Sequence, residues 1–89
     1  MSSNKSGAID AHLGRQLRAR RLHLRMKQAE LAAALQVSIQ QVHKYETAKS
    51  SLPAVSLIPL ARVLGVEPAY FFNGLEAPDT VASPLLRIN

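Results

Sequence analysis

Residues 28–46, with the sequence QAELAAALQVSIQQVHKYE, constrain the fold more than any other part of the chain. The first eight residues are strong helix formers and place Leu31 and Leu35 on one face, four residues apart. After a short break, Ser38 is a good N-cap and predicts a further helix over about residues 39–47. The first of these two helices is short, barely two turns.

Apolar residues at helical spacing predict further helices on both sides of this segment. A first helix is expected from near Ile9 to between His23 and Met26, with Leu13, Leu17 and Leu24 inward.

A fourth helix is expected within residues 53–64, where Pro59 requires either a late start after Ser56 or a kink. Pro68, followed by AYFF, predicts a short fifth helix. The expected fold class is therefore all-α, with five helices.

The pattern divides the chain into three parts. Residues 1–8 are small and polar without periodicity, and are expected to form a disordered lead. The folded domain is expected over residues 9–74. Residues 75–89 contain two prolines and are interpreted as a C-terminal arm or tail that could dock on a partner protein.

Composition and charge narrow the class of protein. The 89 residues include no cysteine, no apolar run of about 18 residues and no signal-peptide pattern, so we expect a cytoplasmic protein that does not enter a membrane. The formal net charge is +5, and no acid occurs between His12 and Gln28. That interval holds a basic run, typical of proteins that contact a polyanion. Its members are Arg15, Arg18, Arg20, Arg21, Arg25 and Lys27.

Candidate catalytic and metal-binding residues are scattered. The three histidines have no carboxylate at ligand spacing, the six acids are dispersed, and no serine lies in a nucleophile motif. The four glycines are isolated, so no phosphate-binding loop is present. We therefore expect neither an enzyme nor a bound metal or cofactor.

Residues 28–46, followed by LARVLGVEPAYFF at residues 60–72, are similar to the Cro/C1-type, or xenobiotic-response-element-like, helix-turn-helix regulators. The similarity covers about residues 13 to 74. It implies a compact, five-helix, lambda-repressor-like DNA-binding domain whose second and third helices form the helix-turn-helix. Its implied ligand is double-stranded DNA.

The resemblance also implies roles for individual residues. Base-reading positions on the third helix are Ile39, Gln40, Gln41, His43 and Lys44. Backbone-contacting positions are Arg25, Lys27, Gln28, Ser38 and Lys49. A glutamine amide can bond N7 and N6–H of adenine together, which suits Gln40 and Gln41 to base reading. Arg21 and Glu46 are expected to form a partly buried ion pair that orients the third helix.

The chain departs from the family pattern at three helix ends. Arg25, Gln36 and Ala48 stand where glycine is usual, so each end is expected either to hold a strained left-handed residue or to adopt another turn. Pro53 replaces the usual cap and Pro59 interrupts the fourth helix, so this region is the least determined.

The resemblance implies a homodimer on a palindromic operator. The expected dimer surface combines the last two helices with the tail, and its residues are Tyr70, Phe71, Phe72, Leu85 and Leu86. The alternative for the phenylalanines is that they close the core.

A repressor is favoured over an activator, since so small a domain can act by occupying its operator. Two other roles stay open. One is an antitoxin that also represses its own operon, and the other is a protein-interaction adaptor that has lost DNA binding.

Overall fold

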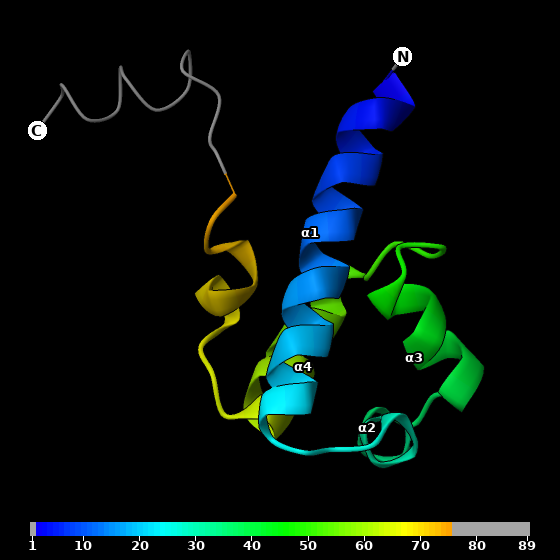
Figure 1. Cartoon of the computed structure of the whole chain (residues 1–89), viewed down its shortest axis with the longest axis vertical. Helices are drawn as coiled ribbons and strands as arrows, with labels where there is room; N and C mark the ends of the chain where they lie inside the picture. The colour runs from blue at the N-terminus through cyan, green and yellow to red at the C-terminus, as the bar shows by residue number, and fades with distance from the viewer. Residues whose placement is uncertain (1, 76–89) are drawn as a thin grey trace, which may run out of the picture.

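Four α-helices make up most of residues 2–75, the part of the chain that the computed structural model describes, with side chains from residue 7 onward. They are α1 (Ser2–His23), α2 (Gln28–Leu35), α3 (Ile39–Glu46) and α4 (Leu57–Leu64), with two 3-10 helices, η1 (Ala54–Ser56) and η2 (Pro68–Phe72). In Figure 1, α1 crosses the front of α4, with α3 on one side and η2 on the other. The predicted all-α class is confirmed, but with four α-helices in the described residues instead of five.

The first helix is longer than the sequence predicted. It begins at Ser2, whereas the expected start was near Ile9 after a disordered lead. No proline occurs in residues 2–8, and Gly7 has open space around it, so nothing there prevents the helix from continuing outward. Residues 2–8 therefore lack apolar periodicity because this end of the helix does not pack on the core, and not because it is irregular. The other end, at His23, lies within the expected range.

Local capping sets the ends of α2 and α3. The Glu30 carboxylate accepts a hydrogen bond from the backbone N–H of Lys27 at 2.7 Å, which closes the first turn of α2. The Ser38 hydroxyl accepts from the N–H of Gln41 at 3.0 Å, in its predicted role as N-cap of α3.

The region around the prolines resolves into a 3-10 turn and a short helix. Of the two expected forms the structure has the late start, with α4 beginning at Leu57 and Pro59 in its first turn. Ser56 precedes the helix but its side chain makes no capping hydrogen bond, because η1 already leads the chain into the helix in a right-handed conformation.

The expected fifth α-helix is wrong in type. The segment Pro68–Phe72 is a 3-10 helix, in which the N–H of Tyr70 donates to the carbonyl of Glu67 at 2.9 Å, three residues back. It is only five residues long, and Gly74 then turns the chain with φ of 84°. There is no room for a sustained α-helical hydrogen-bond ladder.

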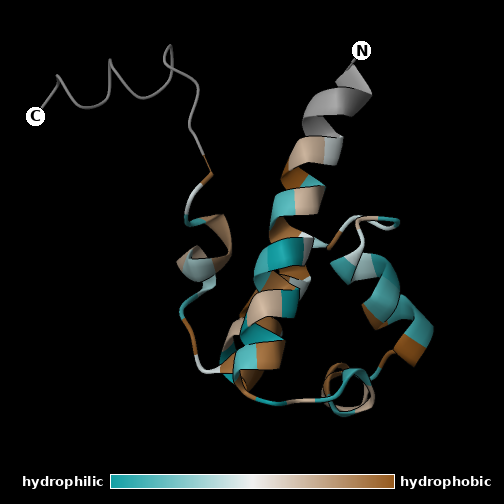
Figure 2. Cartoon of the chain, viewed as in Figure 1, coloured by the Kyte–Doolittle hydropathy of each residue, from teal (hydrophilic) through white to brown (hydrophobic). Residues whose placement is uncertain are grey.

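The core lies between α1, α4 and the α2–α3 pair, and Figure 2 shows apolar residues interspersed with polar ones along these helices. Leu24, which was expected to face inward, is 39% exposed, because α1 has already ended. None of the helices in residues 2–75 combines the length and the hydropathy that a bilayer crossing requires. The buried apolar residues are Leu13, Leu17, Leu31, Ala32, Val42, Leu52, Leu57, Leu60, Ala61, Leu64 and Phe71.

Three non-glycine residues hold left-handed backbone conformations at helix ends. The φ angles are 57° at Arg25, 60° at Gln36 and 62° at Ala48. At each end the next N–H donates to the carbonyl five residues earlier, at 2.9 to 3.0 Å. Of the two expected outcomes, the structure therefore has the left-handed residue at all three positions.

Candidate nucleic-acid interface

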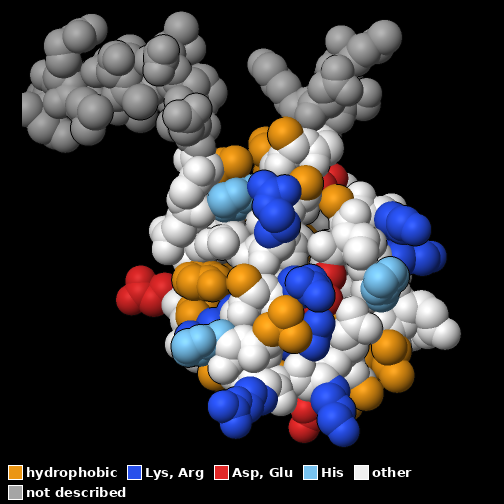
Figure 3. Space-filling view, in the orientation of Figure 1, with side chains coloured by type: hydrophobic (Ala, Val, Ile, Leu, Met, Phe, Trp, Pro, Cys, Tyr) orange, Lys and Arg blue, Asp and Glu red, His pale blue; other side chains and the backbone are white. Residues whose placement is uncertain are grey.

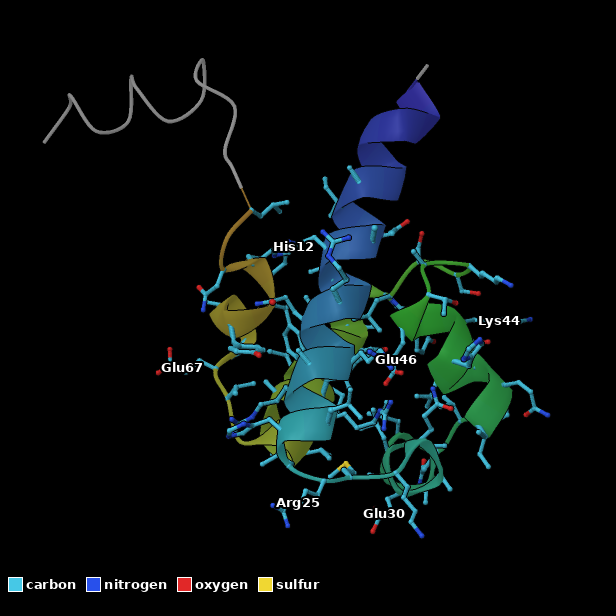
Figure 4. All side chains as sticks on the ribbon, in the orientation of Figure 1. His12, Arg25, Glu30, Lys44, Glu46 and Glu67 are labelled. Carbon is cyan, nitrogen blue, oxygen red and sulfur yellow. The ribbon has the colours of Figure 1, made fainter. Side chains whose placement is uncertain are left out.

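The exposed face of α3 borders a groove of about 530 Å³. Its lining contains two lysines and no carboxylate, so the groove is suited to an anionic ligand. The lysine at position 44 points away from the bundle in Figure 4. The lining residues are Gln28, Ile39, Gln40, His43, Lys44 and Lys49.

Four of the five predicted base-reading positions lie together on this groove. Gln41 does not line it and is half-buried, while its backbone N–H is bonded to the Ser38 cap. Gln40 is exposed on the groove. The two adjacent glutamines, treated alike from the sequence, are thus in different environments.

Arg21 and Glu46 form a buried, two-pronged ion pair between α1 and the end of α3. The Nε atom donates to Oε2 at 2.6 Å and an outer guanidinium nitrogen donates to Oε1 at 3.0 Å. Another guanidinium nitrogen donates to the carbonyl of Met26 at 2.8 Å. Arg21 and Glu46 are 7% and 6% exposed, so the charges are largely removed from water. Figure 4 shows Glu46 pointing into the bundle toward α1.

Gln28 connects this ion pair with the groove. Its side-chain Nε2 donates to Oε1 of Glu46 at 3.0 Å, and the residue also lines the groove. The sequence predicted only a DNA-backbone contact for Gln28. The bond to Glu46 depends on how α2 packs against α3. The spacing of residues in the sequence does not give this relative orientation.

The predicted backbone-contacting residues are more dispersed than the base readers. Lys49 lines the groove, whereas Arg25 and Lys27 are exposed on the α1–α2 turn and do not contribute to its lining. Ser38 is exposed but its hydroxyl is used as the α3 cap.

The basic run does not form one continuous face of α1. Arg21 is in the buried ion pair, and Arg20 Nε donates to the carbonyl of Leu64 at 2.9 Å, at the end of α4. The spacing of Leu13, Leu17 and Arg20 could have revealed this, because i, i+4 and i+7 share one helix face. Arg15 is exposed.

Two histidines have distinct surroundings. His12 forms a 2.7 Å hydrogen bond with the carbonyl of Asn73, whereas His43 lines the groove. In the described part of the chain, no three His, Asp or Glu side chains gather closely enough to hold a metal ion.

Comparisons with known proteins give consistent matches. A family model described as a helix-turn-helix domain matches residues 12–70. The chain is 43% identical over 88 residues to an uncharacterized HTH-type transcriptional regulator of Sinorhizobium fredii, covering 94% of this chain and 62% of that protein. It is 41% identical over 71 residues to an uncharacterized transcriptional regulator in the ATPase CF(0) region of Rhodospirillum rubrum, covering 80% and 66%.

A second Sinorhizobium fredii HTH-type regulator is 39% identical over 79 residues, covering 89% of this chain and 54% of that protein. The chain thus spans between about half and two thirds of the length of these relatives. No solved structure matches it significantly.

Proposed function

Because the chain belongs to the helix-turn-helix family of transcriptional regulators, we propose that it binds double-stranded DNA sequence-specifically, with α3 in the major groove. This is a DNA-binding family and not a family of enzymes. The resemblance noted from the sequence is thereby confirmed at the family level. The proposed DNA-binding domain comprises residues 9–74 in a lambda-repressor-like arrangement, with η2 in place of the fifth helix.

The observation that carries this proposal is the groove on α3, with exposed amide and cationic side chains and no carboxylate in its lining. Gln40 is the favoured base reader, since it is exposed there and its amide suits adenine. Ile39 is 49% exposed and suits a thymine methyl group. Lys44 and Lys49 supply charge for base edges and phosphates.

We further propose a homodimer that places two copies of α3 about 34 Å apart, one turn of DNA. Of the expected surface, the exposed apolar side chains favour the fourth helix over the aromatic segment. Phe71 is fully buried in the core, so it is not part of an interface. Val55 and Ile58 are 79% and 53% exposed, and this η1–α4 patch is the proposed contact between the copies. Leu85 and Leu86, the other predicted members, lie outside the described residues.

Repression is the favoured mode of action, because a bound dimer can exclude polymerase from its operator. The adaptor role is disfavoured by the lining of the α3 groove, whose two lysines and lack of a carboxylate suit a phosphate backbone. The antitoxin role depends on the tail, which lies outside the described residues.

The test is selection from a random duplex pool, followed by titration of the enriched sequence with the wild type, Gln40→Ala and Gln41→Ala. We expect Gln40→Ala to cost about 1–3 kcal/mol on the enriched sequence and to relax preference at one base position. Gln41→Ala should cost less, since Gln41 does not line the groove.

Lys49→Gln provides a matched comparison for charge. It should weaken binding to every sequence alike and reduce the salt dependence by about one released counterion. Arg15→Gln, on the exposed side of α1 and outside the groove lining, should change affinity little. If no sequence is enriched, or if Gln40→Ala leaves the enriched motif unchanged, the assignment of α3 is wrong.

A further inference from the structure

The outward side of α1 carries a second cationic surface that the proposed function does not use. Arg15 and Arg18 are exposed, and Leu22, on the same side, is 47% exposed. We call these three residues the arginine–leucine face. Figure 3 shows this front side of the molecule, where Lys and Arg side chains lie near apolar ones.

The remaining sides of α1 are occupied by the fold. Gly14 lies against the backbone of α3, where a Cβ would be 2.5 Å from the carbonyl oxygen of Tyr45. On the opposite side, Gln16 donates to the carbonyl of Tyr70 at 3.0 Å, and Arg20 donates to that of Leu64.

The arginine–leucine face lies between these two contacts on the outward side of α1, with Arg18, four residues after Gly14, on the border with α3. With 3.6 residues per turn, its three members lie within about 60° of one another. Within residues 7–75, no carboxylate is close enough to form an ion pair with Arg15 or Arg18. No acid occurs in the sequence between Asp10 and Glu30. The charge of this face is therefore uncompensated within the described chain.

The face is better suited to a protein than to DNA. None of its residues lines the α3 groove, so it is separate from the proposed recognition surface. A phosphate backbone would contact the arginines but offers little apolar surface for an exposed leucine. Carboxylates on a helix would form charge-assisted, two-pronged hydrogen bonds with guanidinium groups, and an apolar residue on the same helix would cover Leu22.

We propose that the arginine–leucine face binds an acidic amphipathic helix of a partner protein. The regulator would then hold DNA with α3 and a protein with α1 at the same time. The interaction combines ion pairs with an apolar contact at Leu22. A partner must therefore carry acidic residues next to an apolar residue, and the number of acidic residues alone is not sufficient.

The test uses a synthetic helical peptide with leucines and glutamates along one face. The control peptide has the same composition, with the glutamates moved to the face opposite the leucines. Binding is measured by fluorescence anisotropy, with and without duplex DNA. We expect the first peptide to bind the wild type about tenfold more tightly than the control.

Substitutions locate the site. The double substitution Arg15→Gln, Arg18→Gln should weaken the first peptide about tenfold or more, and Leu22→Gln by about threefold. Arg62→Gln, which removes an exposed arginine from α4, should have about a twofold effect or less. Circular dichroism checks that each variant remains folded.

The DNA measurements distinguish this proposal from the function proposed above. Duplex DNA should not displace the peptide, and the arginine double substitution should leave the sequence preference of DNA binding unchanged. Equal binding of the two peptides, or equal effects of Arg62→Gln and the double substitution, would overturn the proposal. So would displacement by DNA combined with a loss of DNA affinity as large as that of Lys44→Gln, which would assign the face to the DNA interface.

Discussion

Arg25, Gln36 and Ala48 adopt a backbone conformation that a side chain disfavours, because Cβ approaches the following carbonyl oxygen. Each is followed by a hydrogen bond that satisfies a carbonyl of the preceding helix. These bonds explain why the chain accepts the left-handed residue instead of another turn. The resemblance identified the three positions from the sequence. Whether each would hold a left-handed residue or adopt another turn depended on the hydrogen bonds that end the helices.

Gln36→Gly and Ala48→Gly should therefore each stabilise the domain. Relief of left-handed strain outweighs the added flexibility of the unfolded chain, and the expected gain is about 0.5–1 kcal/mol each. The free energy of unfolding, measured by urea titration, tests this. Ala33→Gly, at an exposed helical position of α2, should instead destabilise by about 1 kcal/mol. Losses of similar size at all three positions would contradict the strain argument.

Residues of the site differ in how far sequence could place them. The Arg21–Glu46 contact was anticipated by resemblance, since the two positions match a paired pattern. The additional bond from Gln28 to Glu46 was not, because it requires the relative rotation of α2 and α3. The separation of Gln40 from Gln41 has the same origin: adjacent residues on a helix point about 100° apart, and only packing decides which is exposed.

At the scale of elements, the approach of α1 to α3 determines where the recognition helix sits. A Cβ at Gly14 would lie 2.5 and 2.7 Å from the backbone carbonyl oxygens of Tyr45 and Glu46. Both atoms belong to backbone, so they cannot move aside independently of α3. The absence of a side chain at Gly14 is therefore required for this contact.

Gly14→Ala should destabilise the domain by about 1–3 kcal/mol, despite the better helix propensity of alanine. Gly7→Ala is the matched control, since Gly7 lies in the same helix and a Cβ added there would have nothing within 4 Å. That change should be neutral or stabilising by up to about 1 kcal/mol. Thermal and urea unfolding measure both variants. A tolerated Gly14→Ala would mean that α1 and α3 are not packed this closely.

Elements with strong local signals were predicted best. The bounds of α2 match the expected residues 28–35, because helix formers, a capping glutamate and a break define them locally. The early start of α1 was missed since a helix without a core contact has no apolar period. The 3-10 form of η2 was missed because proline and aromatic residues are compatible with either helix type over five residues.

At the scale of the whole molecule, exposed apolar area is distributed differently from expectation. Phe71 completes the core and stacks edge-on against Tyr70, with ring centroids 5.7 Å apart. The aromatic patch inferred from the sequence is therefore divided, with Phe72 left 43% exposed. The sequence shows how many aromatic residues are present, but it does not show which of them are buried in the core.

Ile58→Glu should weaken the proposed dimer by about tenfold or more, since a carboxylate would be buried on each side of the contact. Sedimentation equilibrium gives the dimer dissociation constant directly. Ile9→Glu is the control, because Ile9 is 42% exposed but belongs to α1 and not to the η1–α4 patch. A wild type that stays monomeric at all concentrations, or equal effects of the two substitutions, would rule out this contact.

The position of Glu46 also affects how the domain can open. It belongs to α3 yet accepts hydrogen bonds from Arg21 of α1 and Gln28 of α2, so three helices meet at one carboxylate. Fraying of α3 from its C-terminal end would break the ion pair and leave a largely buried guanidinium without its counterion, at a cost of about 3–5 kcal/mol. A ligand therefore meets a recognition helix whose C-terminal end is held in place before binding.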